Sequence, residues 1–188
     1  MLVLASASPR RRELLTRAGF SFEIYPADIP EDPLPNEEPT AYVTRLAREK
    51  AQVVFDRLSA GGDAANLAVL GADTTVTLDG HILAKPEDDA DAARMLRILS
   101  GRTHRVITGV ALITARRTEV AAEVTAVKFL TMSDEEIAGY IATGEPMDKA
   151  GAYAIQGRAA CWIPRIEGDF FNGVGLPIAL VTTMLQGR

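Results

Sequence analysis

Residues 6–11 of this chain, Ser-Ala-Ser-Pro-Arg-Arg, place two hydroxyl and two guanidinium groups shortly after the apolar run 2–4. Ser8 is a favoured residue for capping the start of a helix. Pro9 suits the first helical position, because the N–H group that proline lacks would stay unpaired there. The pattern therefore predicts a strand, a turn and a helix that begins at Pro9.

This arrangement favours the binding of an anion. The free amide groups at a helix N-terminus carry partial positive charge, which would stabilise a phosphate beside Ser6 and Ser8. Arg10 and Arg11 can add bidentate hydrogen bonds to the same group. A capped surface helix with a solvated basic turn explains the segment equally well, so other parts of the chain must decide between the two.

A second segment, Gly71-Ala72-Asp73-Thr74, inserts a carboxylate into apolar surroundings. We expect strands over residues 67–71 and 74–78, with Asp73 between them. Removing a carboxylate from water is costly unless a cation or hydrogen-bond donor compensates it. Asp73 is therefore either held by neighbouring threonine hydroxyls and amides in a structural role, or a metal ligand or general base for water.

Two lysines lie at defined points of the predicted elements. Lys50 falls at the buried edge of a long amphipathic helix expected over residues 40–60, which Gly61 and Gly62 end. Lys85 precedes a proline where a strand gives way to a helix. Both lysines are candidate ligands for a negatively charged group.

Gln156 lies near the end of the glycine-rich segment 148–157. Its amide carries both a donor and an acceptor, which is what reading the edge of a nucleobase requires. A glycine-punctuated strand that ends at Gln156 is the structural alternative. A second basic cluster at 101–105 is explained by a helix C-terminus that offsets its own dipole.

Strands and helices alternate along the whole chain, which is typical of an α/β fold. The acidic, proline-rich stretch 26–39 and the segment 168–175 are predicted loops. Further strands are expected over residues 22–25, 105–114, 119–130 and 161–166, and further helices over 86–100, from 133 to about 144 behind a capping box, and from 177.

Composition excludes several classes of protein. The net charge of −5, from 20 basic and 25 acidic residues, argues against non-specific nucleic-acid binding. No apolar run approaches the roughly 20 residues that span a bilayer, so we expect no membrane partner and a cytoplasmic location. The single cysteine, Cys161, excludes an intrachain disulfide, and we expect it in a buried strand. With only His81 and His104 present, a metal site would use oxygen ligands.

Several segments, in this order and over nearly the whole chain, resemble the Maf nucleotide pyrophosphatase family. They are Ser6-Ala7-Ser8-Pro9-Arg10-Arg11, Gly71-Ala72-Asp73-Thr74, Leu83-Ala84-Lys85-Pro86, Gly101-Arg102-Thr103-His104 and Asp148-Lys149-Ala150-Gly151-Ala152-Tyr153.

The resemblance implies one inosine-triphosphatase-like α/β domain over residues 1–188, with an elongated, twisted mixed sheet flanked by helices and a central cleft. It also implies a cytosolic homodimer that hydrolyses a nucleoside triphosphate to the monophosphate and pyrophosphate with Mg²⁺ or Mn²⁺. A metal and cations would stabilise charge on the phosphate oxygens while one carboxylate orients the attacking water.

The resemblance also assigns roles to residues. Asp73 is expected to accept the proton of the attacking water, and Glu31 and Asp73 to hold the metal. Asp28 and Asp32 lie in the same acidic loop as Glu31 and are alternative ligands. Phosphate binding is expected from Ser6, Ser8, Arg11, Lys50 and Lys85.

Arg10, Thr74 and Gln156 match the family branch that takes dTTP and UTP, and modified pyrimidine triphosphates would fit the same pattern. The 7-methyl-GTP branch carries Glu in place of Gln156. Phe171 and Gly173 depart from the commoner Tyr and Val of the closing loop. Two alternatives stay open: a 7-methyl-GTP pyrophosphatase, and a non-catalytic nucleotide-binding regulator of septum formation.

Overall fold

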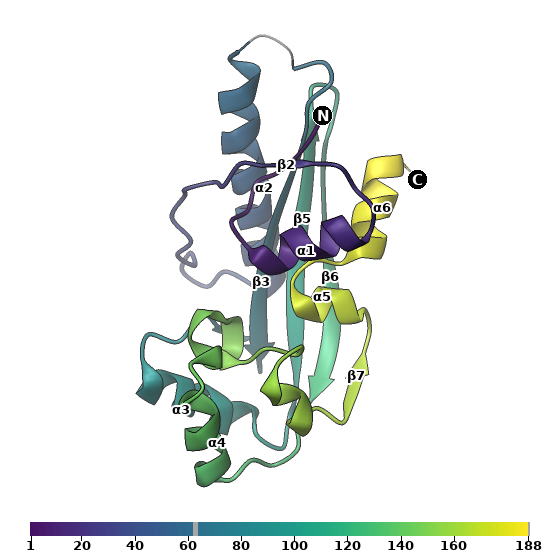
Figure 1. The fold of residues 1–188 in the computed structure, drawn as a ribbon. Coiled ribbons are helices and arrows are strands. Elements are labelled where there is room, and N and C mark those ends of the chain that lie inside the picture. The colour runs from purple at the N-terminus through teal and green to yellow at the C-terminus, as the bar shows by residue number, and fades with distance from the viewer. Residues whose placement is uncertain (62–63, 188) are drawn as a thin grey trace. The chain divides into compact units, whose positions relative to one another are not determined.

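The computed structural model describes residues 1–61 and 64–187; Gly62, one of the two glycines expected to end the long helix, lies outside them. Strands and helices alternate as predicted, and the fold is mixed α/β (Figure 1). The strands are β1 (Leu2–Leu4), β2 (Glu23–Ile24), β3 (Ala68–Leu78), β4 (His81–Leu83), β5 (Thr103–Thr114), β6 (Thr118–Lys128) and β7 (Arg165–Glu167). The α-helices are α1 (Pro9–Arg17), α2 (Pro39–Ser59), α3 (Asp89–Leu99), α4 (Asp134–Ile141), α5 (Phe170–Val174) and α6 (Ile178–Gln186), and the 3-10 helices are η1 (Glu145–Asp148), η2 (Ala150–Ala152) and η3 (Arg158–Trp162).

Within the described residues the strands form a seven-stranded mixed sheet in the order β2-β1-β3-β5-β6-β7, with β4 paired to β3. β1 runs parallel to both β2 and β3, whereas the β3–β4 and β6–β7 pairs are antiparallel. The two strands expected on either side of Asp73 are one uninterrupted strand, β3. Asp73 therefore belongs to a strand interior, where sheet neighbours fix its backbone.

The chain packs as two compact units. Unit 1 comprises the described residues of Met1–Thr74, Thr108–Glu123 and Gly175–Arg188, and unit 2 comprises Thr75–Ile107 and Val124–Val174. The strands β3, β5 and β6 contribute residues to both. The single domain, elongated shape and central cleft implied by the resemblance stay predictions.

The core of unit 1 depends on close contact between α2 and the sheet. Small residues of α2, Ala47 and Ala51, pack against Val69 and Ala111 with almost no exposure to solvent. A Cβ atom at Gly71 would collide with the backbone and side chain of α2, and one at Gly109 would collide with the backbone of Val43. Glycine is thus required at both positions for space, and it lets α2 lie directly on β3 and β5.

Local capping explains where several helices begin. Ser8 caps α1 at Pro9 as predicted, and the predicted capping box of Ser133 and Glu136 opens α4. The helix expected over residues 86–100 begins later, at Asp89, because the Asp88 carboxylate accepts a hydrogen bond from the Asp91 amide and serves as the cap. No helix among the residues described is long and apolar enough to cross a membrane.

The prediction that Cys161 lies in a buried strand is wrong. Cys161 is exposed and belongs to η3, and the strand expected over residues 161–166 is only the short β7. Trp162 is buried and packs edge-on against Tyr140, with ring centroids 5.6 Å apart. The tight 3-10 turn buries Trp162 and leaves its predecessor in solvent. Within the segment expected to be a loop, residues 170–174 form α5.

The core of unit 2 contains a buried histidine that yields a pH prediction. His104 Nε2 lies 2.7 Å from the Tyr153 hydroxyl, and the ring packs edge-on against Phe129. Burial lowers the pKa of His104 to about 4, against roughly 6.5 in an unfolded chain. Between these values the unfolded chain binds a proton that the folded chain excludes. The free energy of unfolding should therefore fall as the pH drops from about 6.5 to about 4, by roughly 3 kcal/mol from this residue.

Denaturant unfolding of the wild type and a His104→Asn variant across this pH range checks the contribution. The difference between the two curves isolates His104 from the carboxylates that titrate nearby. The wild type should lose more stability on acidification than the variant does. If the stability of the two proteins fell equally with pH, the lowered pKa assigned to His104 would be contradicted.

Candidate active site

Ser6 and Ser8 lie at the start of α1, where the sequence predicts an anion site. Ser8 Oγ accepts a hydrogen bond from the Arg11 amide at 3.5 Å, and Ser6 Oγ accepts one from the Ser8 amide at 3.2 Å. Pro9 occupies the first turn of the helix. Both hydroxyls are therefore fixed beside amide groups at the positive end of the helix dipole.

The side chain of Arg11 joins three separated segments of unit 1. Its guanidinium donates to the Gly175 carbonyl at 2.9 Å, the Ala72 carbonyl at 2.8 Å, Ser6 Oγ at 3.1 Å and Thr74 Oγ1 at 3.0 Å. Burial lowers the pKa of Arg11, and the charges of nearby acidic groups oppose that shift. The structure thus gives Arg11 a positioning role that the sequence did not reveal, and its phosphate-binding role stays a prediction.

Thr74 is held by the same network. Besides the bond from Arg11, its hydroxyl lies 2.9 Å from the Thr108 hydroxyl and 3.3 Å from the Gly175 carbonyl. The hydroxyl has several partners, so its orientation is restricted. Arg10, the residue before Arg11 on α1, is half-buried.

The central feature of unit 1 is a buried carboxylate paired with a buried lysine. Asp73 on β3 is 7% exposed and Lys50 on α2 is 6% exposed. Lys50 Nζ lies 2.6 Å from Asp73 Oδ1 and also 2.6 Å from Glu31 Oε1. One ammonium group therefore lies between two carboxylates and offsets the cost of removing Asp73 from water.

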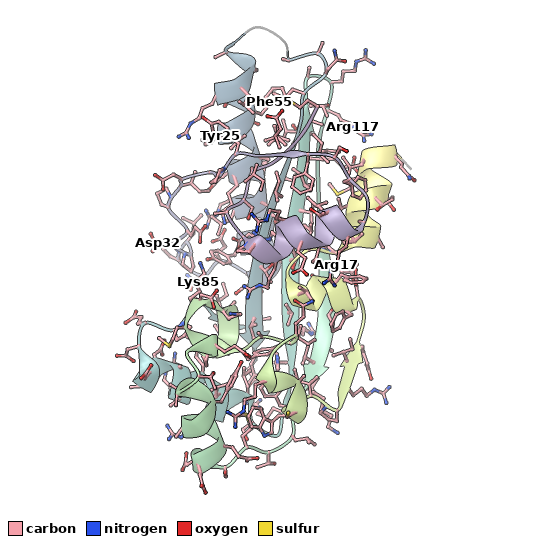
Figure 2. The ribbon with its side chains drawn as sticks, in the orientation of Figure 1. Arg17, Tyr25, Asp32, Phe55, Lys85 and Arg117 are labelled. Carbon is pink, nitrogen blue, oxygen red and sulfur yellow. The ribbon has the colours of Figure 1, made fainter. Side chains whose placement is uncertain are left out.

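The loop between β2 and α2 brings Glu31 to Lys50. The Tyr42 hydroxyl donates to the Glu31 carbonyl at 2.8 Å and so fixes the loop backbone there. Burial, with the charges of Asp73 and Glu31, raises the pKa of Tyr42 to about 12, so the phenol stays protonated and can donate. Asp32 lies in the same loop (Figure 2), and its carbonyl accepts from Arg45 at 3.2 Å.

The predicted metal ligands, Glu31 and Asp73, both contact Lys50. Among the described residues, no group of three or more His, Cys, Asp and Glu side chains is placed to hold a metal ion. The Glu31 and Asp73 carboxylates nevertheless converge on one cation, Lys50. Mg²⁺ is commonly held by one or two carboxylates together with substrate phosphates, and this donor set fits that mode. Asp28 and Asp32 are both exposed, and in the described part of the chain their carboxylates do not converge on a shared cation.

The other two predicted site residues belong to unit 2. Lys85 is exposed in the segment between β4 and α3 (Figure 2). Gln156 is exposed in a turn that the Gly157 amide closes by donating to the Ala154 carbonyl at 3.0 Å. Their action on one substrate together with the residues of unit 1 stays a prediction.

Loss of Lys50 should be costly to stability. A Lys50→Met variant leaves the buried Asp73 carboxylate without its cation, and we expect the free energy of unfolding to fall by about 3 kcal/mol or more. Glu31 is about half exposed, so Glu31→Gln should cost less than about 1 kcal/mol. Denaturant unfolding compares the two, and the double variant Lys50→Met/Asp73→Asn should recover part of the loss. Equal effects of Lys50→Met and Glu31→Gln would contradict this account.

Comparison with known proteins agrees with these motifs. A family model described as Maf-like protein matches residues 1–188. A dTTP/UTP pyrophosphatase of Koribacter versatilis is 54% identical over 98% of this chain and 93% of its own. Proteins of the same name from Salmonella typhimurium and Thermococcus onnurineus are 51% and 50% identical, over 98% and 96% of this chain and 91% and 94% of theirs.

One solved structure is a distant match. A nucleoside-triphosphatase, dITP/XTP pyrophosphatase, from Mycobacterium abscessus is 18% identical with a TM-score of 0.42, over 68% of this chain and 72% of its own. The family model and the relatives at about half identity, each spanning nearly the whole length, show that the chain belongs to the Maf-like protein family.

Proposed function

We propose that this chain is a nucleoside triphosphate pyrophosphatase that hydrolyses dTTP and UTP to the monophosphate and pyrophosphate. The observation that carries the proposal is the Asp73 carboxylate in the interior of β3, paired with Lys50 at 2.6 Å. Nucleotide binding alone leaves a buried carboxylate unexplained, whereas a role as general base for water accounts for it. Relatives about 50% identical over nearly the whole chain bear the name dTTP/UTP pyrophosphatase.

In this reaction a water molecule attacks the α-phosphorus of the nucleotide. The bond from that phosphorus to the oxygen it shares with the β-phosphate breaks, and pyrophosphate leaves. Asp73 accepts the proton that the water releases. Lys50 Nζ, 2.6 Å from Asp73 Oδ1, holds the carboxylate in place. Ser6, Ser8 and the amides of α1 hold the phosphate oxygens, with Arg11, Lys50 and Lys85 as the cations around them.

Glu31 and Asp73 are the residues that would hold Mg²⁺ or Mn²⁺. When bound there, the ion would supply positive charge to stabilise the negative charge that develops on the phosphate. The support for this assignment is the convergence of the two carboxylates on one ammonium group.

Base selection is assigned to Arg10, Thr74 and Gln156. The Gln156 amide can donate to a carbonyl and accept from the imide N–H of uracil or thymine, which a carboxylate does less well. A base that cannot pair with this amide forgoes both hydrogen bonds and binds less tightly. A homodimer in the cytoplasm remains part of the proposal on the strength of the family resemblance.

Replacing Asp73 tests the chemistry. Asp73→Asn should lower pyrophosphate release from UTP by at least about a hundredfold, because the amide cannot accept the proton of water. The matched control is Asp56→Asn, a neutralised carboxylate that is exposed on α2. Circular dichroism establishes that both variants fold. Undiminished turnover in Asp73→Asn would refute the role of Asp73 as general base.

A substrate panel tests the base assignment. Pyrophosphate release from dTTP, UTP, CTP, GTP, 7-methyl-GTP and inosine triphosphate should favour dTTP and UTP, and Gln156→Glu should reduce that preference about tenfold or more. Preference for 7-methyl-GTP would replace the pyrimidine assignment with the other branch of the family. Tight triphosphate binding without turnover would favour the non-catalytic regulator.

A further inference from the structure

The turn that carries Gln156 has one buried and one exposed central residue. Ile155 is 7% exposed and anchors the turn, whereas the side chain of Gln156 is exposed. The Gly157 amide donates to the Ala154 carbonyl at 3.0 Å and closes the turn. The position of Gln156 therefore depends on what holds the backbone on its two sides.

Both sides are held by one hydrogen-bonded pair from outside the turn. The Tyr140 hydroxyl donates to Glu145 Oε1 at 2.6 Å and accepts from the Ala154 amide at 3.2 Å. Glu145 Oε2 accepts from the Arg158 amide at 3.2 Å. The amides two residues before and two residues after Gln156 thus end on the two linked side chains, which we call the Tyr140–Glu145 clamp.

The clamp has a rigid base. Tyr140 is completely buried, and its ring packs edge-on against that of Trp162. Burial, and then the bond to Glu145, raises the pKa of Tyr140, so the hydroxyl keeps its proton and can donate to the carboxylate. Tyr140 lies on α4.

Gly157 fits tightly against the clamp. Its φ of −102° is available to any residue, so conformation does not demand glycine. A Cβ atom at this position would instead collide with the carboxylate of Glu145. A side chain at residue 157 and the Glu145 hydrogen bonds therefore exclude each other.

We infer that Tyr140 and Glu145 are positioning residues that hold the 154–158 turn so that Gln156 discriminates between pyrimidine bases. The inference rests on the proposed function. Uracil presents an acceptor and a donor where cytosine presents the reverse, so the Gln156 amide must meet the base in one orientation to prefer uracil. The side chain can keep that orientation at the base edge only if the backbone that carries it is held in one place.

The test measures kcat/KM for UTP and for CTP. Tyr140→Phe removes one oxygen and retains the buried ring, and it should lower the UTP:CTP ratio about tenfold, with a higher KM for UTP. Glu145→Ala should change the ratio in the same direction. Glu145→Gln keeps a carbonyl acceptor for the Arg158 amide, so its UTP:CTP ratio should stay closer to that of the wild type.

The matched control is Ser133→Ala, which removes a cap from the same helix and should lower the melting temperature without changing the ratio. A Gly157→Ala variant adds a second test, because the new methyl group should displace the Glu145 carboxylate and lower the ratio as Glu145→Ala does. In the Glu145→Ala background the same change should add little.

The outcomes separate the two proposals. A wild-type enzyme without preference for UTP over CTP would refute the base assignment and this inference together. A selective wild type whose ratio is unchanged in both Tyr140→Phe and Glu145→Ala would overturn the positioning role alone. Additive losses in the Gly157→Ala/Glu145→Ala double variant would also overturn it, because they would show that the two residues act independently.

Discussion

The buried pair between Lys50 and Asp73 is the constraint on which the rest of unit 1 depends. A carboxylate in the interior of β3 needs a cation or hydrogen-bond donors to offset its removal from water, and here α2 supplies the cation. Lys50 reaches it because α2 lies directly on the sheet, which the missing side chains of Gly71 and Gly109 allow. Backbone packing of small residues thus determines where the charged chemistry occurs, and the loop of Glu31 completes the charge arrangement.

Two kinds of support surround the groups that would contact a nucleotide. In unit 1, the Arg11 guanidinium donates hydrogen bonds to protein oxygens and thereby fixes Ser6 and Thr74. In unit 2, a tyrosine and a glutamate hold the turn of Gln156. In each case a side chain that the sequence marks only as charged or aromatic determines the geometry of a neighbour, which is how a site gains precision beyond its contacting residues.

The sequence predicted what local chemistry dictates. The start of α1 at Pro9 and the capping box of α4 follow from cap residues that act within one turn. The burial of Lys50 followed from helical periodicity. The pairing of Lys50 with Asp73 could not be predicted, because it joins residues far apart in the chain and requires α2 to lie on β3. The exposure of Cys161 was missed because the apolar run 159–163 is compatible with a buried strand as well as with a 3-10 helix.

The most direct test of the account is to identify the products formed from UTP in the presence of Mg²⁺ by phosphorus NMR. The account predicts that UMP and pyrophosphate form in equal amounts. The UTP signals should decrease at the rate at which the product signals grow. Formation of UDP and orthophosphate, or persistence of intact UTP, would contradict the account.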